Sequence, residues 1–386
     1  MECPYIPFTS LDDFSLRLGK KVIQQHIPLT GSLEVTARCN LRCVHCYINM
    51  PADDSAELDQ ELSGIEIKMI IDQIVDEGCL RLLLTGGEPF LRRDFLDIYT
   101  YAKRKGLLVT IFTNGTLLTP RTADYLGEWR PSVIEITLYG SSQETYERVT
   151  GIPGSYACCM DGINLLLERS LPLKLKSMVL TINKDEITEL QAFAESLGVD
   201  YRFDTALNQR LDGNSQPAGY RITPEDAARL DISGQNREEE WLRFTEKYAG
   251  PPPKPEYLYQ CGAGISSFHI DPYGQLSVCM MARMPSYDLR QGSFVEGWRE
   301  FIPQVTAQKW SRQTACQTCE IYALCNQCPG WSQIESADQQ IPVEYLCEVA
   351  HHRAQALGIA IRKETQTGEL DDAKAENGEI LRVTDD

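Results

Sequence analysis

Three cysteines lie close together near the start of the chain, at Cys39, Cys43 and Cys46. Their segment, residues 39–46, reads CNLRCVHC and follows a short apolar stretch that predicts a strand. Thiolates on one loop can face a single centre, either a metal ion or an iron–sulfur cluster. Structural zinc usually takes four ligands, whereas three thiolates suit a four-iron cluster with one open iron. Because His45 is the one nearby nitrogen and lies inside the segment, the pattern favours the cluster over zinc.

A second group of cysteines occupies the last third of the chain. It consists of Cys261, Cys279, Cys316, Cys319, Cys325, Cys328 and Cys347, so the two groups hold ten of the 14 cysteines. The first residues show no basic start followed by an apolar block, so no export signal is predicted and a cytoplasmic location is expected. Disulfides are rare in such a reducing compartment, and clustered thiols there indicate metal ligands or redox groups. Cys316 to Cys328 alone would also suit a zinc knuckle, which would leave the other three thiols unused.

Composition sets limits on the class of protein. The chain has 386 residues, of which 42% are hydrophobic, so it can bury a sizeable core. No apolar run reaches about 18 residues, so no membrane span is predicted. The formal net charge of -18 argues against non-specific binding of nucleic acid or anionic lipid, because both need a basic face.

Apolar periodicity predicts alternating strands and helices around the first cysteine group. The expected strands are 33–36, 80–85, 107–113, 133–139, 173–180 and 201–206. The expected helices are 63–77, 94–103, 119–126, 156–169, 186–197 and a last one from Thr223 to about Tyr248, broken near Gly234. Repeated strand–helix units build a parallel sheet with helices outside, and six units are fewer than the eight of a closed barrel. The predicted fold class is α/β, a partial (β/α)6 TIM-type barrel with a small C-terminal cysteine-rich α+β domain that binds clusters.

At residues 39–46 the sequence resembles the radical S-adenosylmethionine (SAM) superfamily. The signature of that superfamily is C-x3-C-x-aromatic-C, and His45 stands here at the ring position where Tyr or Phe is commoner. The resemblance implies a 4Fe–4S cluster on Cys39, Cys43 and Cys46 whose open iron binds the amino and carboxylate groups of SAM. It also implies reductive cleavage of SAM to methionine and a 5′-deoxyadenosyl radical.

Residues 85–89, TGGEP, look like the GGEP motif of the same superfamily. Two glycines let backbone approach a ligand closely, and a carboxylate suits an ammonium group. By resemblance, Thr137 on the fourth strand contacts SAM and Arg148 grips its carboxylate; an ordinary turn and a solvated helix arginine are the alternatives. All these positions are expected at the carboxyl ends of predicted strands, the functional face of a β/α barrel. The predicted SAM-binding residues are His45, Gly86, Gly87, Glu88, Pro89, Asn114, Thr137 and Arg148.

The second cysteine group resembles the SPASM extension of radical SAM peptide-modifying enzymes, which holds two auxiliary iron–sulfur clusters. The resemblance implies an outer cluster on Cys316, Cys319, Cys325 and Cys347, and an inner cluster on Cys261, Cys279 and Cys328. Two residues precede the fourth clustered cysteine where the family usually has three. Seven thiols cannot fill eight positions, so the inner cluster has an open iron, a ligand such as Glu256 or Tyr257, or fewer irons.

The resemblance implies an enzyme that abstracts a hydrogen atom from a substrate. A ribosomally made precursor peptide is the expected substrate, and a thioether or carbon–carbon crosslink is the expected product. Maturation of a whole protein of the sulfatase type, modification of a small metabolite, and a metal-cluster scaffold without radical activity remain alternatives. No residue is assigned a catalytic role. Three residues after the last predicted strand, which also suit a solvated loop, are predicted to contact the substrate: Asp204, Arg210 and Asp212.

Partners and domains follow from the same interpretation. Residues 1–30 are too few for a peptide-recognition domain, so a separate leader-binding protein is expected, together with a reductant such as flavodoxin or ferredoxin. Proline-rich residues 251–255 suggest a stiff linker, and the segment from Lys363 carries eight acids against three bases, which is typical of disorder. The expected divisions are a lead-in at 1–30, the radical SAM barrel at 31–213, a helical bridge and linker at 214–255, the SPASM domain at 256–348, and a helix end with an acidic tail at 349–386.

Overall fold

The computed structural model describes residues 10–48, 50–234 and 237–359. In these ranges one sheet of nine strands has the order β11-β10-β9-β1-β4-β5-β6-β7-β8. Six of its strands are parallel neighbours: β1 Thr30–Thr36, β4 Arg81–Gly86, β5 Leu108–Thr113, β6 Val133–Thr137, β7 Leu173–Met178 and β8 Asp200–Asp204. This arrangement confirms the predicted α/β partial barrel.

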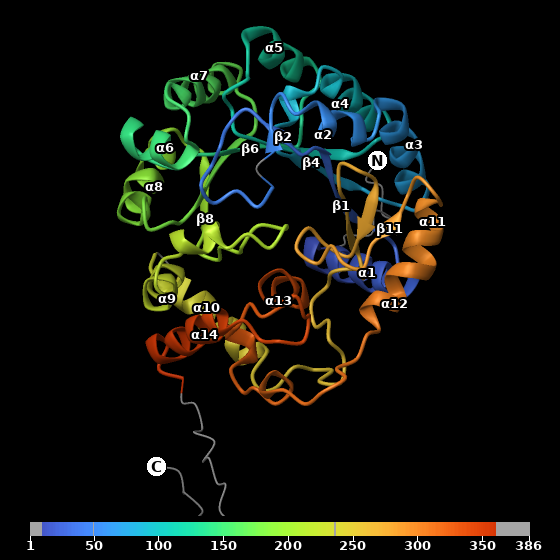
Figure 1. Cartoon of the computed structure of the whole chain (residues 1–386), viewed down its shortest axis with the longest axis vertical. Helices are drawn as coiled ribbons and strands as arrows, with labels where there is room; N and C mark the ends of the chain where they lie inside the picture. The colour runs from blue at the N-terminus through green and yellow to red at the C-terminus, as the bar shows by residue number, and fades with distance from the viewer. Residues whose placement is uncertain (1–9, 49, 235–236, 360–386) are drawn as a thin grey trace, which may run out of the picture.

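Helices cover the outside of the curved sheet (Figure 1). They are α3 Gly64–Asp76, α4 Phe95–Arg104, α5 Pro120–Glu128, α6 Gln143–Thr150, α7 Ser155–Glu168 and α8 Ile187–Ser196. The sequence predicted a single helix after the fourth strand, whereas the structure has two, α6 and α7. Ser142 begins the additional helix, because its side chain accepts the Thr145 N–H, and Gly151 ends it in a left-handed conformation.

Local sequence explains why α3 forms where it was predicted. Ser63 accepts the backbone N–H of Glu66, whose side chain accepts the Ser63 N–H, so the two residues form a capping box. The four isoleucines at helical spacing, Ile67, Ile70, Ile71 and Ile74, are all buried against the sheet. Both the start of the helix and its apolar face are therefore encoded locally.

The C-terminal third of the chain continues the same sheet. Strand β9 Ser267–Ile270 pairs in parallel with β1, and β10 Gln275–Ser277 and β11 Tyr287–Asp288 extend the sheet in antiparallel order. The first parallel strand is thus covered on its free edge by a segment more than 200 residues later in the chain. Hydrogen bonding therefore joins the barrel to the cysteine-rich region.

The remaining α-helices and strands belong neither to the nine-stranded sheet nor to the helices that cover it. They are α1 Leu11–Gln25, α2 Ser55–Gln60, α9 Pro224–Ile232, α10 Arg237–Lys247, α11 Phe294–Glu296, α12 Ile302–Thr306, α13 Pro329–Ser336, α14 Glu344–Ala356, and the short pair β2 Arg38–Cys39 and β3 Met50–Pro51. No described helix is both long and apolar enough to cross a membrane. The predicted acidic tail lies outside the described residues.

Candidate active site

A cavity lies at the carboxyl ends of the parallel strands. Its walls come from the cysteine loop 39–47, the turn 85–87 after β4, and residues at or near the ends of β5 to β8. Met280, from the cysteine-rich region, closes one side. The cavity therefore occupies the face on which β/α barrels place their functional residues.

All three cysteines of the first group line this cavity. The loop that carries them is fastened to the end of α6, because the Arg42 N–H donates to the Thr150 carbonyl over 2.9 Å and the Val44 N–H donates to the Val149 carbonyl over 3.0 Å. Burial raises the pKa of Cys39 to about 12 and the pKa of Cys43 further above its usual value. A bound metal cluster would have to displace these protons, so binding of the cluster is linked to proton release.

The donor set fits an iron–sulfur cluster. Among the described residues, no group of three or more His, Cys, Asp or Glu side chains has the geometry for a single metal ion. His45 lines the same cavity, and its buried Nδ1 has no hydrogen-bond partner in the described part of the chain. Burial lowers the pKa of His45 to about 4, so the ring is neutral and packs edge-on against Tyr139. The cavity thus combines three thiols with a neutral planar ring.

Gly86 and Gly87 permit a close approach of two backbone segments. The Gly87 N–H donates to the Thr36 carbonyl over 2.8 Å, and the Glu88 N–H donates to the Arg38 carbonyl over 2.9 Å. A Cβ atom at Gly86 would overlap the Thr36 carbonyl oxygen, and one at Gly87 would overlap the carbonyl oxygens of Arg38 and Ala37. Glycine is therefore required for the turn after β4 to lie against the start of the cysteine loop.

The sequence analysis predicted that Glu88 binds SAM, but the Glu88 side chain does not line the cavity. Its side chain is fully buried and accepts the Thr113 hydroxyl at 2.8 Å, the Asn114 N–H at 2.7 Å and the Phe90 N–H at 3.1 Å. Burial raises the pKa of Glu88 to about 7. Glu88 therefore ties the end of β4 to the end of β5. Pro89 is likewise buried and does not line the cavity.

The other residues predicted to bind SAM have different positions. Asn114 and Thr137 line the cavity, and the Asn114 amide lies 3.7 Å from the Cys39 sulfur. Arg148 instead lies exposed on α6 and is not part of the cavity wall. That Arg148 grips the SAM carboxylate stays a prediction, and its exposed position on α6 agrees with the alternative of a solvated helix arginine.

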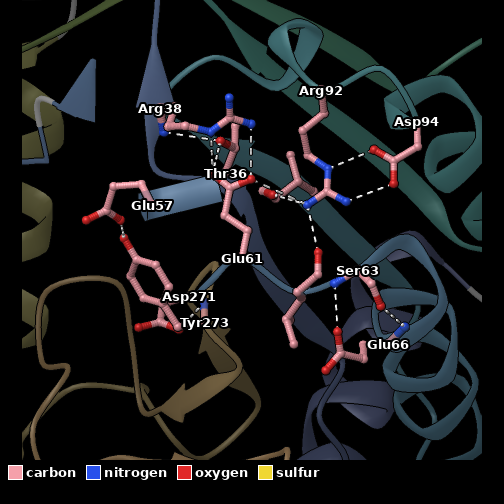
Figure 2. Close-up of polar contacts among 12 residues, drawn as sticks. Thr36, Arg38, Glu57, Glu61, Ser63, Glu66, Arg92, Asp94, Asp271 and Tyr273 are labelled. Carbon is pink, nitrogen blue, oxygen red and sulfur yellow. Dashed lines mark hydrogen bonds and ion pairs between the residues drawn. The ribbon is translucent and has the colours of Figure 1, made fainter. Parts of the chain in front are cut away.

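A buried ionic cluster joins both ends of the segment that holds the cysteine loop. Figure 2 shows Arg38, which precedes Cys39, and Arg92, which follows the GGEP turn, both directed at Glu61 after α2. Glu61 accepts from Arg38 Nε at 3.0 Å and Nη2 at 3.2 Å, and Arg92 also pairs with Asp94. The cluster fixes the position at which the loop leaves the sheet.

A second buried network connects the cysteine loop to the C-terminal region, and sequence analysis missed it. Glu34 on β1 accepts the Tyr47 hydroxyl at 2.8 Å and two Arg283 nitrogens at 2.9 and 2.6 Å. Burial opposes the ionised form, but Arg283 and His269 together hold the pKa of Glu34 below its usual range. Tyr47 follows the third cysteine directly, and its hydroxyl also lies 3.7 Å from the sulfur of Met280. A carboxylate between Leu33 and Val35 in a predicted strand was the one signal that sequence offered.

The cysteines of the C-terminal group fall into two neighbourhoods. In the first, burial raises the pKa of Cys316, and the nearby Cys319 and Cys347 raise it further. Burial and the same three thiols also raise the pKa of Cys325. In the second, burial raises the pKa of Cys328, and the nearby Cys279 and Cys261 raise it further. Electrostatic coupling of this kind requires that the thiols lie near one another. The two neighbourhoods have the same members as the two ligand sets predicted by resemblance.

The structure separates the three residues predicted to contact the substrate. Asp204 ends β8 and lines the cavity, whereas Arg210 and Asp212 pair with each other at 3.0 Å outside its wall. Their loop still lies beside the site, because the Leu211 N–H donates to the Tyr47 carbonyl over 3.1 Å. The solvated salt bridge considered as the alternative is thus the observed arrangement for Arg210 and Asp212.

Comparison with known families identifies the class of domain. Residues 33–194 match the profile of the Radical SAM superfamily. The chain therefore contains a radical SAM domain, and the resemblance predicted from the cysteine and GGEP motifs is confirmed. That superfamily uses SAM and a 4Fe–4S cluster, which fits the three thiols and the neighbouring cavity.

Named relatives fall into two groups. The AdoMet-dependent heme synthase of Methanosarcina barkeri is 36% identical over 46% of this chain and 50% of its own length. The heme synthase of Nitratidesulfovibrio vulgaris is 24% identical over 83% of this chain and 92% of its own. The mycofactocin maturase MftC of Mycolicibacterium smegmatis is 27% identical over 77% of each chain. The chain thus spans about half the length of the relative with the highest identity among these three.

Solved structures share the fold. Streptococcus suis SuiB bound to the precursor peptide SuiA superposes with a TM-score of 0.59 over 83% of this chain and 79% of that chain, at 15% identity. The structure of anSMEcpe with bound AdoMet superposes with a TM-score of 0.61 over 84% of this chain and 96% of that chain, at 12% identity. At such low identities the likeness concerns the fold alone.

Proposed function

We propose that this protein cleaves SAM reductively and abstracts a hydrogen atom from a substrate bound in the same cavity. The observation that carries this proposal is the convergence of three thiols, two glycines and Thr137 on one cavity at the carboxyl edge of the sheet. When bound, the 4Fe–4S cluster and SAM together supply a 5′-deoxyadenosyl radical. A metal-cluster scaffold would have no need for a cavity beside its thiols.

The residues of the chain have distinct tasks in this proposal. Cys39, Cys43 and Cys46 hold the cluster, and the backbone at 86–87 faces the ligand from β4. Glu88 positions this backbone through the ends of β4 and β5 instead of touching SAM.

The C-terminal thiols hold two further iron–sulfur clusters in this proposal. Cys316, Cys319, Cys325 and Cys347 bind the outer cluster, and Cys261, Cys279 and Cys328 bind the inner one. An electron left on the substrate after hydrogen abstraction has an acceptor there, so the net reaction is oxidative. The variant Cys319→Ala should still form 5′-deoxyadenosine but no product; full product formation by this variant would exclude an essential outer cluster.

The proposed substrate is a ribosomally made precursor peptide, and the proposed product carries a thioether or a carbon–carbon crosslink. Relatives named as maturases support this choice, because MftC aligns over 77% of this chain. The shared fold with SuiB, whose structure contains its precursor peptide, also supports this choice. A leader-binding partner, a flavodoxin or ferredoxin reductant and a cytoplasmic location belong to the same proposal.

A small-molecule substrate is the second candidate. Relatives named heme synthase support it, since one aligns over 83% of this chain. Incubation of the reconstituted protein with a precursor peptide or with an iron porphyrin, followed by mass spectrometry, separates the two. A mass change in the peptide alone supports the first candidate, and a change in the porphyrin alone overturns it.

The first experiment is anaerobic reconstitution followed by counting of iron and sulfide. Dithionite and SAM are then added, and 5′-deoxyadenosine is measured. Roughly twelve irons per chain together with 5′-deoxyadenosine support three four-iron clusters and radical initiation. Intact clusters without 5′-deoxyadenosine would reject the proposed activity.

A further inference from the structure

A charged group on the cavity wall plays no part in the chemistry described so far. Lys176 on β7 and Arg202 on β8 both line the cavity. Arg202 Nη2 donates to Glu135 Oε2 over 2.7 Å, and Lys176 Nζ lies 3.7 Å from that same oxygen. Glu135 lies on β6 and does not itself line the cavity. Two cations therefore share one oxygen of one carboxylate.

Asp204, which also lines the cavity, lies near Arg202, so the carboxylates around this group serve Arg202 more than Lys176. Glu135 forms its shorter contact with Arg202, so Lys176 has the weaker share of the counter-charge. The Lys176 side chain is only 17% exposed, and its ammonium faces the ring of Phe112. Burial and the nearby Arg202 lower the pKa of Lys176 to about 7, although Glu135 acts in the opposite direction. An anion arriving from the cavity would give Lys176 a counter-charge of its own.

Register places this group away from the cysteine and glycine side of the cavity. Thr137, Lys176 and Arg202 are direct partners across β6, β7 and β8, so they form one layer of the barrel. Strand β7 is the third neighbour from β4, roughly 14 Å along the sheet at about 4.8 Å per strand. The amino and carboxylate groups of SAM share one carbon atom and belong near the open iron. Thr137, the residue proposed to contact SAM, lies between the two sides, so we take SAM to fill the side at the cysteines and the substrate to fill the side at Lys176.

We propose that Lys176, with Arg202 beside it, binds a carboxylate of the substrate. The group recognised is an aliphatic carboxylate, whether it belongs to an acidic side chain or chain end of a peptide or to a propionate of a small molecule. The ammonium is a point charge and the guanidinium offers a fork, so together they can hold both oxygens. The inference rests on the proposed function only in taking this cavity as the substrate site.

Protection from acetylation tests the inference directly. Reconstituted, SAM-loaded protein is treated at pH 7 with limiting acetic anhydride, which reacts with neutral amines. The probes are N-acetylglutamic acid N-methylamide and its glutamine analogue, at equal concentration and ionic strength. Binding of the acid should raise the pKa of Lys176, and a rise of one unit lowers its neutral fraction about fivefold. Peptide mass spectrometry should show this loss of labelling at Lys176.

Lys174 provides an internal control. It lies two residues earlier on the same face of β7, is paired with Asp200 at 2.7 Å, and does not line the cavity. Its labelling should not change with either probe. Equal labelling of Lys176 with the acid and the amide would overturn the inference, because it would show that charge is not recognised.

Variants separate substrate recognition from cofactor recognition. Lys176→Met should weaken binding of the acid probe about tenfold in equilibrium dialysis, whereas Lys174→Met should change it less than about twofold. The affinity for SAM should be unchanged in both variants. A tenfold loss of SAM affinity in Lys176→Met with unchanged probe binding would overturn the inference. None of these measurements requires SAM cleavage, so a protein that binds the probe but forms no 5′-deoxyadenosine would contradict the proposed function alone.

Discussion

Replacing Glu61 with glutamine tests how the structure supports the cysteine loop. The Glu61 side chain is 2% exposed and neutralises Arg38, which is 9% exposed. Glutamine keeps one acceptor oxygen but removes the charge, while Arg92 keeps its bond to Asp94. Removing one partner of a buried ion pair costs about 3–5 kcal/mol. Because one hydrogen bond and the Arg92 pair survive, we expect Glu61→Gln to lower the free energy of unfolding by about 3 kcal/mol.

Glu66→Gln is the matched control (Figure 2). Glu66 pairs with Arg290 at the same Nε–Oε1 distance of 3.0 Å, but both side chains are 37% exposed. Glutamine at this position can still complete the capping box with Ser63. An exposed pair contributes about 0–1 kcal/mol, so the control should lose less than about 1 kcal/mol.

Equilibrium unfolding in urea measures the free energy of unfolding of both variants. The comparison is valid if the dependence of this free energy on urea concentration is the same in the two variants and the parent protein. The double variant Arg38→Met/Glu61→Met should recover part of the stability, because no buried charge is left unpaired by it. Iron content after reconstitution should fall in Glu61→Gln, since Arg38 directly precedes Cys39. Equal losses of stability in Glu61→Gln and Glu66→Gln would refute the reasoning that burial gives this pair its importance.

Three other perturbations address the site and its supports. Gly87→Ala should abolish SAM binding in a filter assay, because its methyl group overlaps the Arg38 carbonyl, whereas Gly127→Ala, with nothing within 4 Å, should bind normally. Cys43→Ala should form no 5′-deoxyadenosine while its other clusters stay visible by electron paramagnetic resonance; retained cleavage would disprove the ligand assignment. Burial lowers the pKa of His269 to about 4, so between pH 6.5 and pH 4 the unfolded chain binds a proton that the folded chain does not bind. The free energy of unfolding should therefore fall as the pH drops over this range, by about 3 kcal/mol from this group. His269→Gln should show a correspondingly smaller loss in urea unfolding over this range, and parallel profiles would contradict the assignment.

Local sequence was sufficient for most of the fold. Capping at Ser63 and the spacing of the isoleucines in 67–74 depend on residues within one or two turns, and the structure confirms both. Strands such as Arg81–Gly86 and Leu108–Thr113 were predictable because each holds a short apolar run and precedes a helix. The division into α6 and α7 escaped prediction, since its signals, Ser142 and Gly151, are also ordinary loop residues.

The cavity itself depended on contacts between distant residues. Glu34 and Arg283 are 249 positions apart, and nothing in either segment indicates the other. Glu88 sits in a motif that suggested contact with a ligand, yet three donors around the ends of β4 and β5 occupy its carboxylate. A motif specifies the residue type, but the direction of its side chain depends on which neighbours are close enough to bond.

The sequence by itself determined the radical SAM domain, because cysteine spacing, the GGEP turn and strand periodicity are all local properties of the chain. Tertiary structure alone decided which charged groups share the cavity. Lys176, Arg202 and Glu135 meet only through the register of β6, β7 and β8, and β9 covers β1 only after more than 200 intervening residues. Register and long-range pairing depend on packing of the whole sheet, so no single segment encodes them.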